Sequence, residues 1–269
     1  MQTSFLRWAG SKKKLLPRLL PYWQASGCTR YVEPFAGSAM LYFAIKPRNA
    51  VLADTNNELI GMYHAVQRDW RAVFRTITDF SCTEKFYYKL RDEDCTKRSV
   101  AYRAARFIYL NRFCFNGLYR TNSEGRFNVP FAKGTNRELP TEDEFRQFAS
   151  DISRRKVQFR NQDFRATLQQ AQEGDFVYAD PPYAAENKRI FNQYGPATFG
   201  INDLRDLATE LQELDDRGVR FVVSYAYTKD AVEILGEWGC KSVNVQRTVA
   251  SNVECRKSVR ELFVSNIRI

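Results

Sequence analysis

Apolar residues along the chain fall into short continuous runs that alternate with longer stretches of helical spacing. The short runs predict seven strands, over Arg30–Glu33, Ala50–Ala53, Lys156–Arg160, Asp175–Ala179, Val219–Ser224, Ser242–Thr248 and Glu261–Ile267. The helical spacing predicts helices over Lys14–Trp23, Ser38–Ile45, Glu58–Val66, Val100–Phe113, Asn202–Arg217 and Ala231–Trp238. This alternation favours an α/β fold with a mainly parallel sheet covered on both faces. Because no helix separates the last two strands, we expect them to form an antiparallel hairpin at the edge of the sheet.

Residues 55–144 interrupt the alternation. They are helical, basic and aromatic at first and become rich in turn residues through NSEGRFNVPFAKGTN, residues 122–136. We interpret this stretch as a domain inserted between the second and third strands. Residues 1–54 and 145–269 then form the two halves of one sheet domain.

The charge of the chain is concentrated in this insertion. The 269 residues include 41 Lys or Arg and 31 Asp or Glu, which gives a net charge of +10. Residues 97–137 hold nine basic side chains and a single acidic one, Glu124. A solvated surface usually mixes both signs, so this block indicates a polyanionic partner.

The composition weighs against several other classes. A single histidine, His64, leaves almost no material for a zinc site or a Ser-His triad, and we expect it to be structural and no metal to be bound. The six cysteines contain no C-x-x-C pair, which indicates reduced thiols in a cytosolic protein. No apolar run approaches the ~18 residues of a membrane helix, so we expect no membrane partner.

Residues with chemical character follow three of the predicted strands. The first strand runs into PFAGSA (34–39), the second ends at Asp54, and the fourth ends at DPPY (180–183). Ligands of open parallel sheets bind beyond the carboxyl ends of the strands, so these ends should meet at one crevice. Gly37 permits close backbone approach, and Asp54 can accept both hydroxyls of an adenosine ribose. The alternatives are an ordinary connecting turn and an N-cap for the helix near Glu58.

The DPPY motif is the most specific of these elements. Pro181 and Pro182 hold the chain extended, so that the Pro181 carbonyl and the Asp180 carboxylate can present two fixed acceptors to an exocyclic amine. Tyr183 offers a ring on which a planar base can stack. The alternative is an ordinary turn that ends a strand. In the N-terminal FLRWAGSKKK, Lys12 could pair with a ligand carboxylate, or the segment could be a solvated basic tail.

Together with LADTN and LNRFCFNGLYRTNSEGRFNVPF, these motifs resemble those of the Dam-type DNA adenine-N6 methyltransferases, of the alpha motif order. The resemblance covers nearly the whole chain. It implies a Rossmann-like, seven-stranded S-adenosylmethionine methyltransferase sheet with an inserted helical and β-hairpin DNA-recognition domain. It also implies S-adenosyl-L-methionine as cofactor and double-stranded DNA as substrate. We expect a monomeric cytoplasmic enzyme, bacterial or phage-encoded and associated with the nucleoid, either solitary or part of a restriction–modification pair.

The resemblance assigns roles to individual residues. Catalytic residues would be Asp180, Pro181, Pro182 and Tyr183. Cofactor contacts would be Trp8, Lys12, Phe35, Gly37, Asp54, Asp163, Phe164 and Asp180, with Asp54 at the ribose and Asp163 and Phe164 at the adenine. Two departures are Ala39, where many members have a second glycine, and residues 184–200, which follow the usual Phe-x-x-Tyr lid only loosely. From Ala39 we expect weaker cofactor affinity at most.

DNA contacts by the same resemblance would be Arg7, Phe115, Asn116, Leu118, Arg120 and Pro130. Arg7 and Arg120 would read two guanines, which favours GATC as the target. Arg106 and Arg112 would suit phosphates. The alternative for Phe115 and Leu118 is a place in the core.

Three other functions stay open at this stage. An RNA adenine methyltransferase would use the same chemistry on another polymer. A sequence-specific DNA-binding protein without catalysis is disfavoured by the intact Asp180 and Tyr183. A nicotinamide oxidoreductase is disfavoured by DPPY and the basic insertion.

Overall fold

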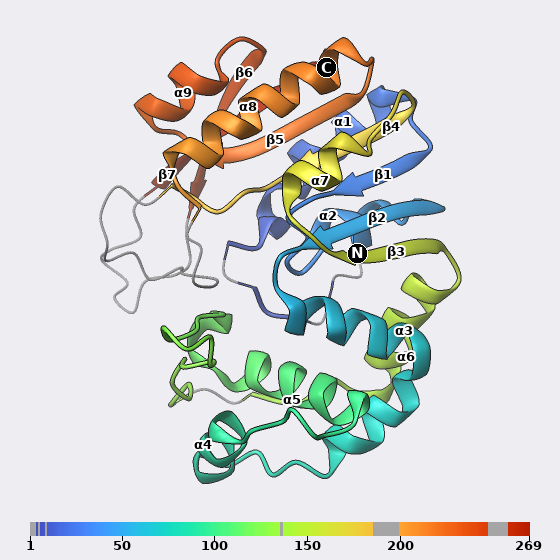
Figure 1. Cartoon of the computed structure of the whole chain (residues 1–269), viewed down its shortest axis with the longest axis vertical. Coiled ribbons are helices and arrows are strands. Elements are labelled where there is room, and N and C mark those ends of the chain that lie inside the picture. Colours follow the sequence, from blue (N-terminus) through green and yellow to red (C-terminus); the bar gives the residue numbers. More distant parts are fainter. Residues whose placement is uncertain (1–3, 5, 9, 135–136, 185–198, 247–257) are drawn as a thin grey trace.

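The computed structural model describes residues 4, 6–8, 10–134, 137–184, 199–246 and 258–269 (Figure 1). Its strands are β1 (Arg30–Glu33), β2 (Asn49–Asp54), β3 (Lys156–Asn161), β4 (Asp175–Ala179), β5 (Arg220–Ala226), β6 (Gly239–Gln246) and β7 (Ser258–Ser265). Its helices are η1 (Lys12–Leu15), α1 (Leu16–Ser26), α2 (Met40–Ile45), α3 (Asn57–Thr78), α4 (Glu84–Asp92), α5 (Val100–Phe113), η2 (Phe115–Gly117), α6 (Glu142–Ser153), α7 (Phe164–Gln169), α8 (Ile201–Asp216) and α9 (Lys229–Leu235).

The strands form one seven-stranded sheet in the order β3-β2-β1-β4-β5-β7-β6. The first five strands pair in parallel, and β7 runs antiparallel between β5 and β6. The predicted α/β fold and the hairpin at the sheet edge are therefore confirmed. The end predicted for the sixth strand, Thr248, lies outside the described residues, and β7 begins three residues before its predicted start.

Both faces of the sheet are covered, as the alternation predicted. Neighbouring residues of a strand point to opposite faces, and the sequence places large side chains on both. On one face, Tyr31 stacks on Phe176 with ring centroids 6.0 Å apart, in a core shared with α1, α2 and α3. On the other face, Val32 and Val177 pack in a core shared with α7, α8 and α9.

The helix near Glu58 is much longer than predicted. It begins after Asn56, whose side chain accepts a hydrogen bond from Leu59 N–H, and it runs to Thr78 with a kink at Asp69. Asn56, and not Asp54, is thus its N-cap. Helix α3, itself within the predicted inserted domain, packs against β2 and β3 as well as against α5, so it joins the sheet to the rest of that domain.

The predicted inserted domain contains α4, which the apolar spacing did not reveal, and α5, which has the predicted bounds. Helices α4 and α5 lie at the end of the molecule away from α8 and α9 (Figure 1). The turn-rich stretch after α5 makes two isolated antiparallel bridges, Cys114 with Phe131 and Thr121 with Phe127, in place of a full β-hairpin. Across the residues that the structure covers, no helix has the length and apolar character needed to cross a bilayer.

Candidate active site

The carboxyl ends of β2, β1 and β4 lie side by side because these strands are neighbours in the sheet. Three acidic residues stand at these ends: Asp54, Glu33 and Asp180. Burial raises the pKa of Glu33 well above its usual range, and the nearby charges of Asp180 and Asp54 raise it further. The structure thus brings the three predicted strand ends together, with Glu33 in the strand between those that carry Asp54 and Asp180.

Asp180 is held by two groups at one of its oxygens. Lys12 Nζ lies 3.2 Å from Asp180 Oδ1, and Ser224 Oγ donates a hydrogen bond to the same oxygen at 3.0 Å. The hydroxyl of Tyr178 lies 2.9 Å from Ser224 Oγ, which orients the serine in turn. The Asp180 side chain keeps 22% of its surface exposed, so a ligand can reach it.

Lys12 and Tyr183 meet a second buried acid, Glu261 of β7. Lys12 Nζ donates to Tyr183 Oη at 3.1 Å and lies 3.3 Å from Glu261 Oε2. Tyr183 Oη donates to Glu261 Oε1 at 2.9 Å. The ammonium predicted to meet a ligand carboxylate is therefore shared between two carboxylates of the protein.

The charges of this cluster shift one another's pKa values. Burial raises the pKa of Asp180, and the Lys12 ammonium works against that rise. Burial by itself would lower the pKa of Lys12, but Asp180, Tyr183 and Glu261 reverse the effect and raise it. Lys12 thus stays charged and keeps Asp180 a usable acceptor.

The PFAGSA turn and Asp54 form one structure. Gly37 N–H donates to Asp54 Oδ2 at 3.0 Å, and Asn56 N–H donates to Oδ1 at 2.9 Å. A carboxylate has about four acceptor positions, so Asp54 retains capacity for two hydroxyl donors. Gly37 has a φ of +47°, and a Cβ there would lie 2.8 Å from Trp8 Nε1. This turn and its carboxylate fit a ribose.

Aromatic rings lie beside this turn. Phe35 stacks on Phe164 with centroids 5.2 Å apart, and Phe199 meets Phe35 edge-on at 5.9 Å. Asp163 caps α7 by accepting from Arg165 N–H, and its carboxylate also pairs with the Arg165 guanidinium. Of the two residues predicted to contact the cofactor adenine, Phe164 is thus part of an apolar cluster, and Asp163 is an exposed acid paired with Arg165.

Ala39 occupies a backbone conformation that favours glycine. Its φ and ψ are 50° and 42°, in the left-handed region, directly before α2. Its N–H donates to Ala36 O at 2.6 Å. The second glycine common at this position in the resembled family is thus replaced here by a residue under backbone strain.

The predicted DNA contacts gather around η2. Phe115 is 44% exposed, which contradicts the core alternative for this residue, and its N–H donates to Pro130 O. Asn116 adopts a φ of +54°. Leu118 is half-buried against the core, and the Nε of Arg120 donates to Asn128 Oδ1 at 2.7 Å.

Arg106 does not have the predicted role of a phosphate contact. Its side chain is buried in α5, where Nε donates to Leu90 O at 2.8 Å and Nη2 to Arg91 O at 2.7 Å. Its Nη1 also pairs with Glu58 at 3.4 Å. The positive charge of an arginine on a helix does not show whether its side chain faces the core or the solvent. The sequence alone could therefore not reveal that Arg106 is buried. Arg112, which donates to Glu138 O, stays a predicted phosphate contact.

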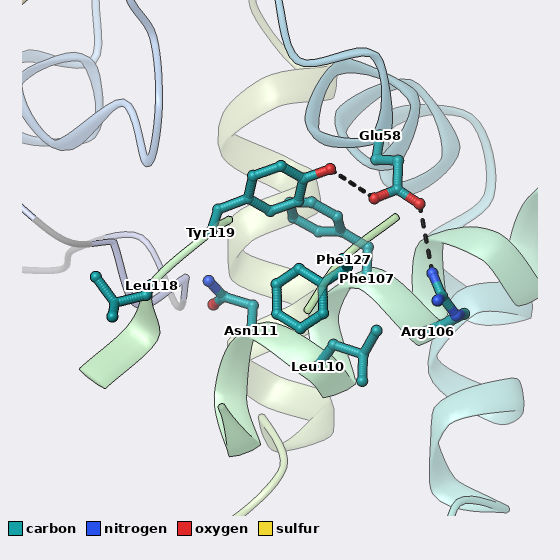
Figure 2. Close-up of a pocket in the computed structure, with 8 residues that line it drawn as sticks. All are labelled: Glu58, Arg106, Phe107, Leu110, Asn111, Leu118, Tyr119 and Phe127. Atoms are coloured by element: carbon teal, nitrogen blue, oxygen red, sulfur yellow. Dashed lines mark hydrogen bonds and ion pairs between the residues drawn. The ribbon is translucent and has the colours of Figure 1, made fainter. Parts of the chain in front are cut away.

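Figure 2 shows where Glu58 of α3 meets residues from α5 and from the segment after it. Tyr119 Oη donates to Glu58 Oε2 at 2.7 Å, on the same carboxylate that Arg106 binds. Trp8 stacks on Tyr119 with centroids 6.0 Å apart. The cavity between these residues has a volume of about 10 Å³, too little for a ligand. These contacts therefore have a structural role.

The sequence analysis gave no role to Glu33, Ser224 and Glu261 of this site, nor to Asn111, whose side chain holds the main chain of Arg7. Glu261 carried a readable signal, because it is an acid within the apolar run ELFV and β7 buries it to 4% exposure. Ser224 and Asn111 look like any polar residue in an apolar segment. Only the topology reveals which neighbours they face.

Comparisons with known proteins identify the family to which the chain is similar. The family described as D12 class N6 adenine-specific DNA methyltransferase matches residues 8–249. A DNA adenine methylase of Serratia marcescens is 33% identical, over 97% of this chain and 97% of that protein. The Type II methyltransferase M1.LlaDCHI of Lactococcus lactis subsp. cremoris is 30% identical, over 97% and 94%. A DNA adenine methylase of Escherichia coli K12 is 31% identical, over 97% and 94%.

Proposed function

Because the chain belongs to the D12 class of N6 adenine-specific DNA methyltransferases, we propose that it methylates a flipped adenine within GATC, with S-adenosylmethionine as methyl donor. Membership of the family makes the chain an adenine-specific DNA methyltransferase. The target sequence, the cofactor and the residue roles are the proposed part. The observation that supports the proposed role of Asp180 in methyl transfer is its carboxylate at the end of β4, which a ligand can reach and which Lys12 and Ser224 hold.

The proposed mechanism begins with access. An adenine inside a duplex cannot present its amine to an acid at the end of a sheet strand, so it must leave the stack. Asp180 Oδ2 and the Pro181 carbonyl then accept hydrogen bonds from the two N–H groups of the amine. These bonds draw the nitrogen out of its planar, conjugated state, so that its lone pair is available to the methyl group. Tyr183, whose hydroxyl is fixed by Lys12 and Glu261, offers its ring to the base. In this mechanism the rate enhancement comes from holding the amine in the right position and from the charges placed around it.

The cofactor fits the turn between β1 and α2. Asp54 would hold the ribose, Gly37 would leave room for close approach, and Phe35 and Phe164 would line the adenine. S-adenosylmethionine supplies a methyl group activated by a sulfonium. Trp8 packs against Gly37, so a side chain at 37 would displace the indole and reshape this cradle.

The proposed DNA surface is the η2 region with Arg7 and Arg120. Guanidinium groups suit bidentate contacts to guanine, which supports the GATC assignment. Phe115, exposed beside Asn116, would enter the disrupted stack. In this proposal residues 55–144 form the recognition domain, residues 1–54 and 145–269 form the catalytic domain, and the enzyme acts as a monomer.

The test is methyl transfer from labelled S-adenosylmethionine to four substrates: a GATC duplex, duplexes with one altered base, single-stranded DNA, and RNA of the same sequence. We expect the GATC duplex to be preferred and Asp180→Asn to abolish transfer while DNA binding persists. Asp216→Asn, an exposed acid on α8, is the matched control. Equal transfer to all duplexes would refute the GATC assignment, and a preference for RNA would favour the RNA enzyme.

A further inference from the structure

Glu261 is a buried acid whose two oxygens serve different partners. Oε1 accepts from the Tyr183 hydroxyl at 2.9 Å, and Oε2 lies 3.3 Å from Lys12 Nζ. Glu261 is 4% exposed, and burial of a carboxylate is costly unless it is paired. Both partners come from the proposed active site, so the position of Glu261 in β7 is tied to that site.

Lys12 in turn determines how Asp180 is presented. Lys12 and Ser224 both contact Oδ1, at 3.2 Å and 3.0 Å. Within the described residues no hydrogen bond reaches Oδ2. One oxygen of the carboxylate is therefore anchored, and the other is the one left to accept a hydrogen from an amine.

We propose that Glu261 is a positioning residue for methyl transfer, which seats Lys12 and Tyr183 and thereby fixes Asp180 with Oδ2 directed to the adenine amine. The inference rests on the proposed function of Asp180. Glu261 touches no substrate in this scheme. It holds the ammonium between two carboxylates, so that Lys12 orients Asp180 without neutralising it as an acceptor.

The electrostatics of the cluster give this role a measurable signature. The titratable or charged groups that face Asp180, from η1, β1, β4, the DPPY turn and β7, are Lys12, Tyr31, Glu33, Tyr178, Tyr183 and Glu261. Burial is the main cause of the raised pKa of Asp180, and the negative charge of Glu261 raises it further. Loss of that charge leaves Lys12 paired with Asp180 alone. The pKa of Asp180 then falls, and its carboxylate becomes a poorer acceptor.

The experiment measures single-turnover methyl transfer to a GATC duplex, with enzyme and S-adenosylmethionine in excess, between pH 5 and pH 9. For Glu261→Gln we expect a rate about 10- to 100-fold lower, because Asp180 is misplaced. We expect unchanged affinity for the duplex and for S-adenosylmethionine. The acidic limb of the profile should move to lower pH, a shift that a purely structural residue would not cause.

Two further variants sharpen the test. Glu210→Gln removes another buried carboxylate, on α8, which accepts from Gln169 of α7, and should leave the rate and the profile unchanged. In a Tyr183→Phe background, Glu261→Gln should cost less than it does alone, because one of its two partners is already gone.

The outcomes separate the inference from the proposed function. A wild-type protein that transfers no methyl group would refute the function itself. With an active wild type, a Glu261→Gln rate within twofold, or a loss with no shift of the acidic limb, would overturn the positioning role. If Glu261→Gln does not fold, Glu261→Asp decides: it keeps the charge and shortens the reach, so the rate should fall while the limb stays in place.

Discussion

Asn111 clasps the main chain of Arg7 at both of its polar groups. Asn111 Oδ1 accepts from Arg7 N–H at 2.8 Å, and Asn111 Nδ2 donates to Arg7 O. These bonds join the N-terminal segment to α5 across 104 residues of sequence. Arg7, the predicted reader of one guanine, is thereby held in register with η2, where Phe115 and Asn116 lie.

Gly117 packs directly against Arg7, so replacing it should disturb the contact between the N-terminal segment and η2. A Cβ at Gly117 would lie 2.8 Å from Arg7 Cβ, on a backbone with a φ of +64°. Gly125 has a φ of +76° and nothing within 4 Å, so Gly125→Ala isolates the backbone strain, about 1–2 kcal/mol. Gly117→Ala should lower the free energy of unfolding by more, and it alone should weaken discrimination at the guanine assigned to Arg7. Urea unfolding measures the loss of stability, and methyl transfer to a panel of single-base duplex variants measures the discrimination. Equal stability and equal discrimination in Gly117→Ala and Gly125→Ala would contradict the proposed role of the contact between Gly117 and Arg7.

The two arginines Arg106 and Arg120 should behave oppositely on replacement. Arg106→Ala leaves the carbonyls of Leu90 and Arg91 without their donors, so we expect a loss of about 2–4 kcal/mol in the free energy of unfolding. The salt dependence of DNA binding should stay the same. Arg120→Ala should leave stability nearly unchanged and narrow the preference for GATC by about 1–3 kcal/mol.

The matched variant for this comparison is Arg106→Lys. It keeps the charge and loses the planar fork, so it should destabilise the protein nearly as much as alanine does. A salt slope that fell in Arg106→Ala would restore Arg106 as a phosphate contact. An Arg120→Ala enzyme that lost activity equally on all duplexes would show that Arg120 positions DNA without reading it.

Ala39→Gly should relieve strain at the turn before α2. Alanine at a φ of 50° costs about 1–2 kcal/mol, while glycine adds roughly 0.5–1 kcal/mol of lost entropy on folding. We therefore expect a gain of about 0–1.5 kcal/mol in the free energy of unfolding, measured by urea unfolding. Calorimetric titration with S-adenosylmethionine should show equal or tighter binding. Markedly weaker binding would mean that the Ala39 methyl group contacts the cofactor.

Glu33→Gln should stabilise the protein in a pH-dependent way. Burial raises the pKa of Glu33 in the folded state, so its contribution to stability is complete below the pKa of the unfolded chain. That contribution is lost as pH rises toward the folded-state pKa. Glutamine can still accept from the Tyr31 hydroxyl and carries no charge. The variant should gain stability over wild type at pH 8 and little at pH 4, and equal unfolding curves at both pH values would refute this.

The sequence predicted the sheet well because strand signals are local. The continuous run FVYA in β4 and the alternation of large residues around Tyr31 need no knowledge of the neighbours. Helices were harder. The apolar spacing of α3 weakens near Asp69, where the helix kinks, and the prediction stopped at Val66. Helix α6 had a readable start, the capping box of Thr141 and Glu144.

The candidate site was predictable where a motif encodes geometry and unpredictable where long-range packing does. Asp180 and Asp54 follow strands directly, so their places at the sheet edge follow from the strand assignment. Arg106 looked like a surface cation because the spacing of α5 does not reveal that α4 covers it with two carbonyl groups. Segment 185–198, with most of the predicted Phe-x-x-Tyr lid, lies outside the described residues.

The place of β7 between β5 and β6 also bears on the order of folding. It sets Glu261 beside Lys12, and this contact spans 249 residues of sequence. Contacts of such separation pay the largest loop-closure entropy and tend to form late. During synthesis the earlier, parallel strands can assemble first, while the ammonium of Lys12 still lacks one of its carboxylates. If Glu261 positions Lys12 as proposed, catalytic competence is a late event, and methyl transfer reports that β7 has docked.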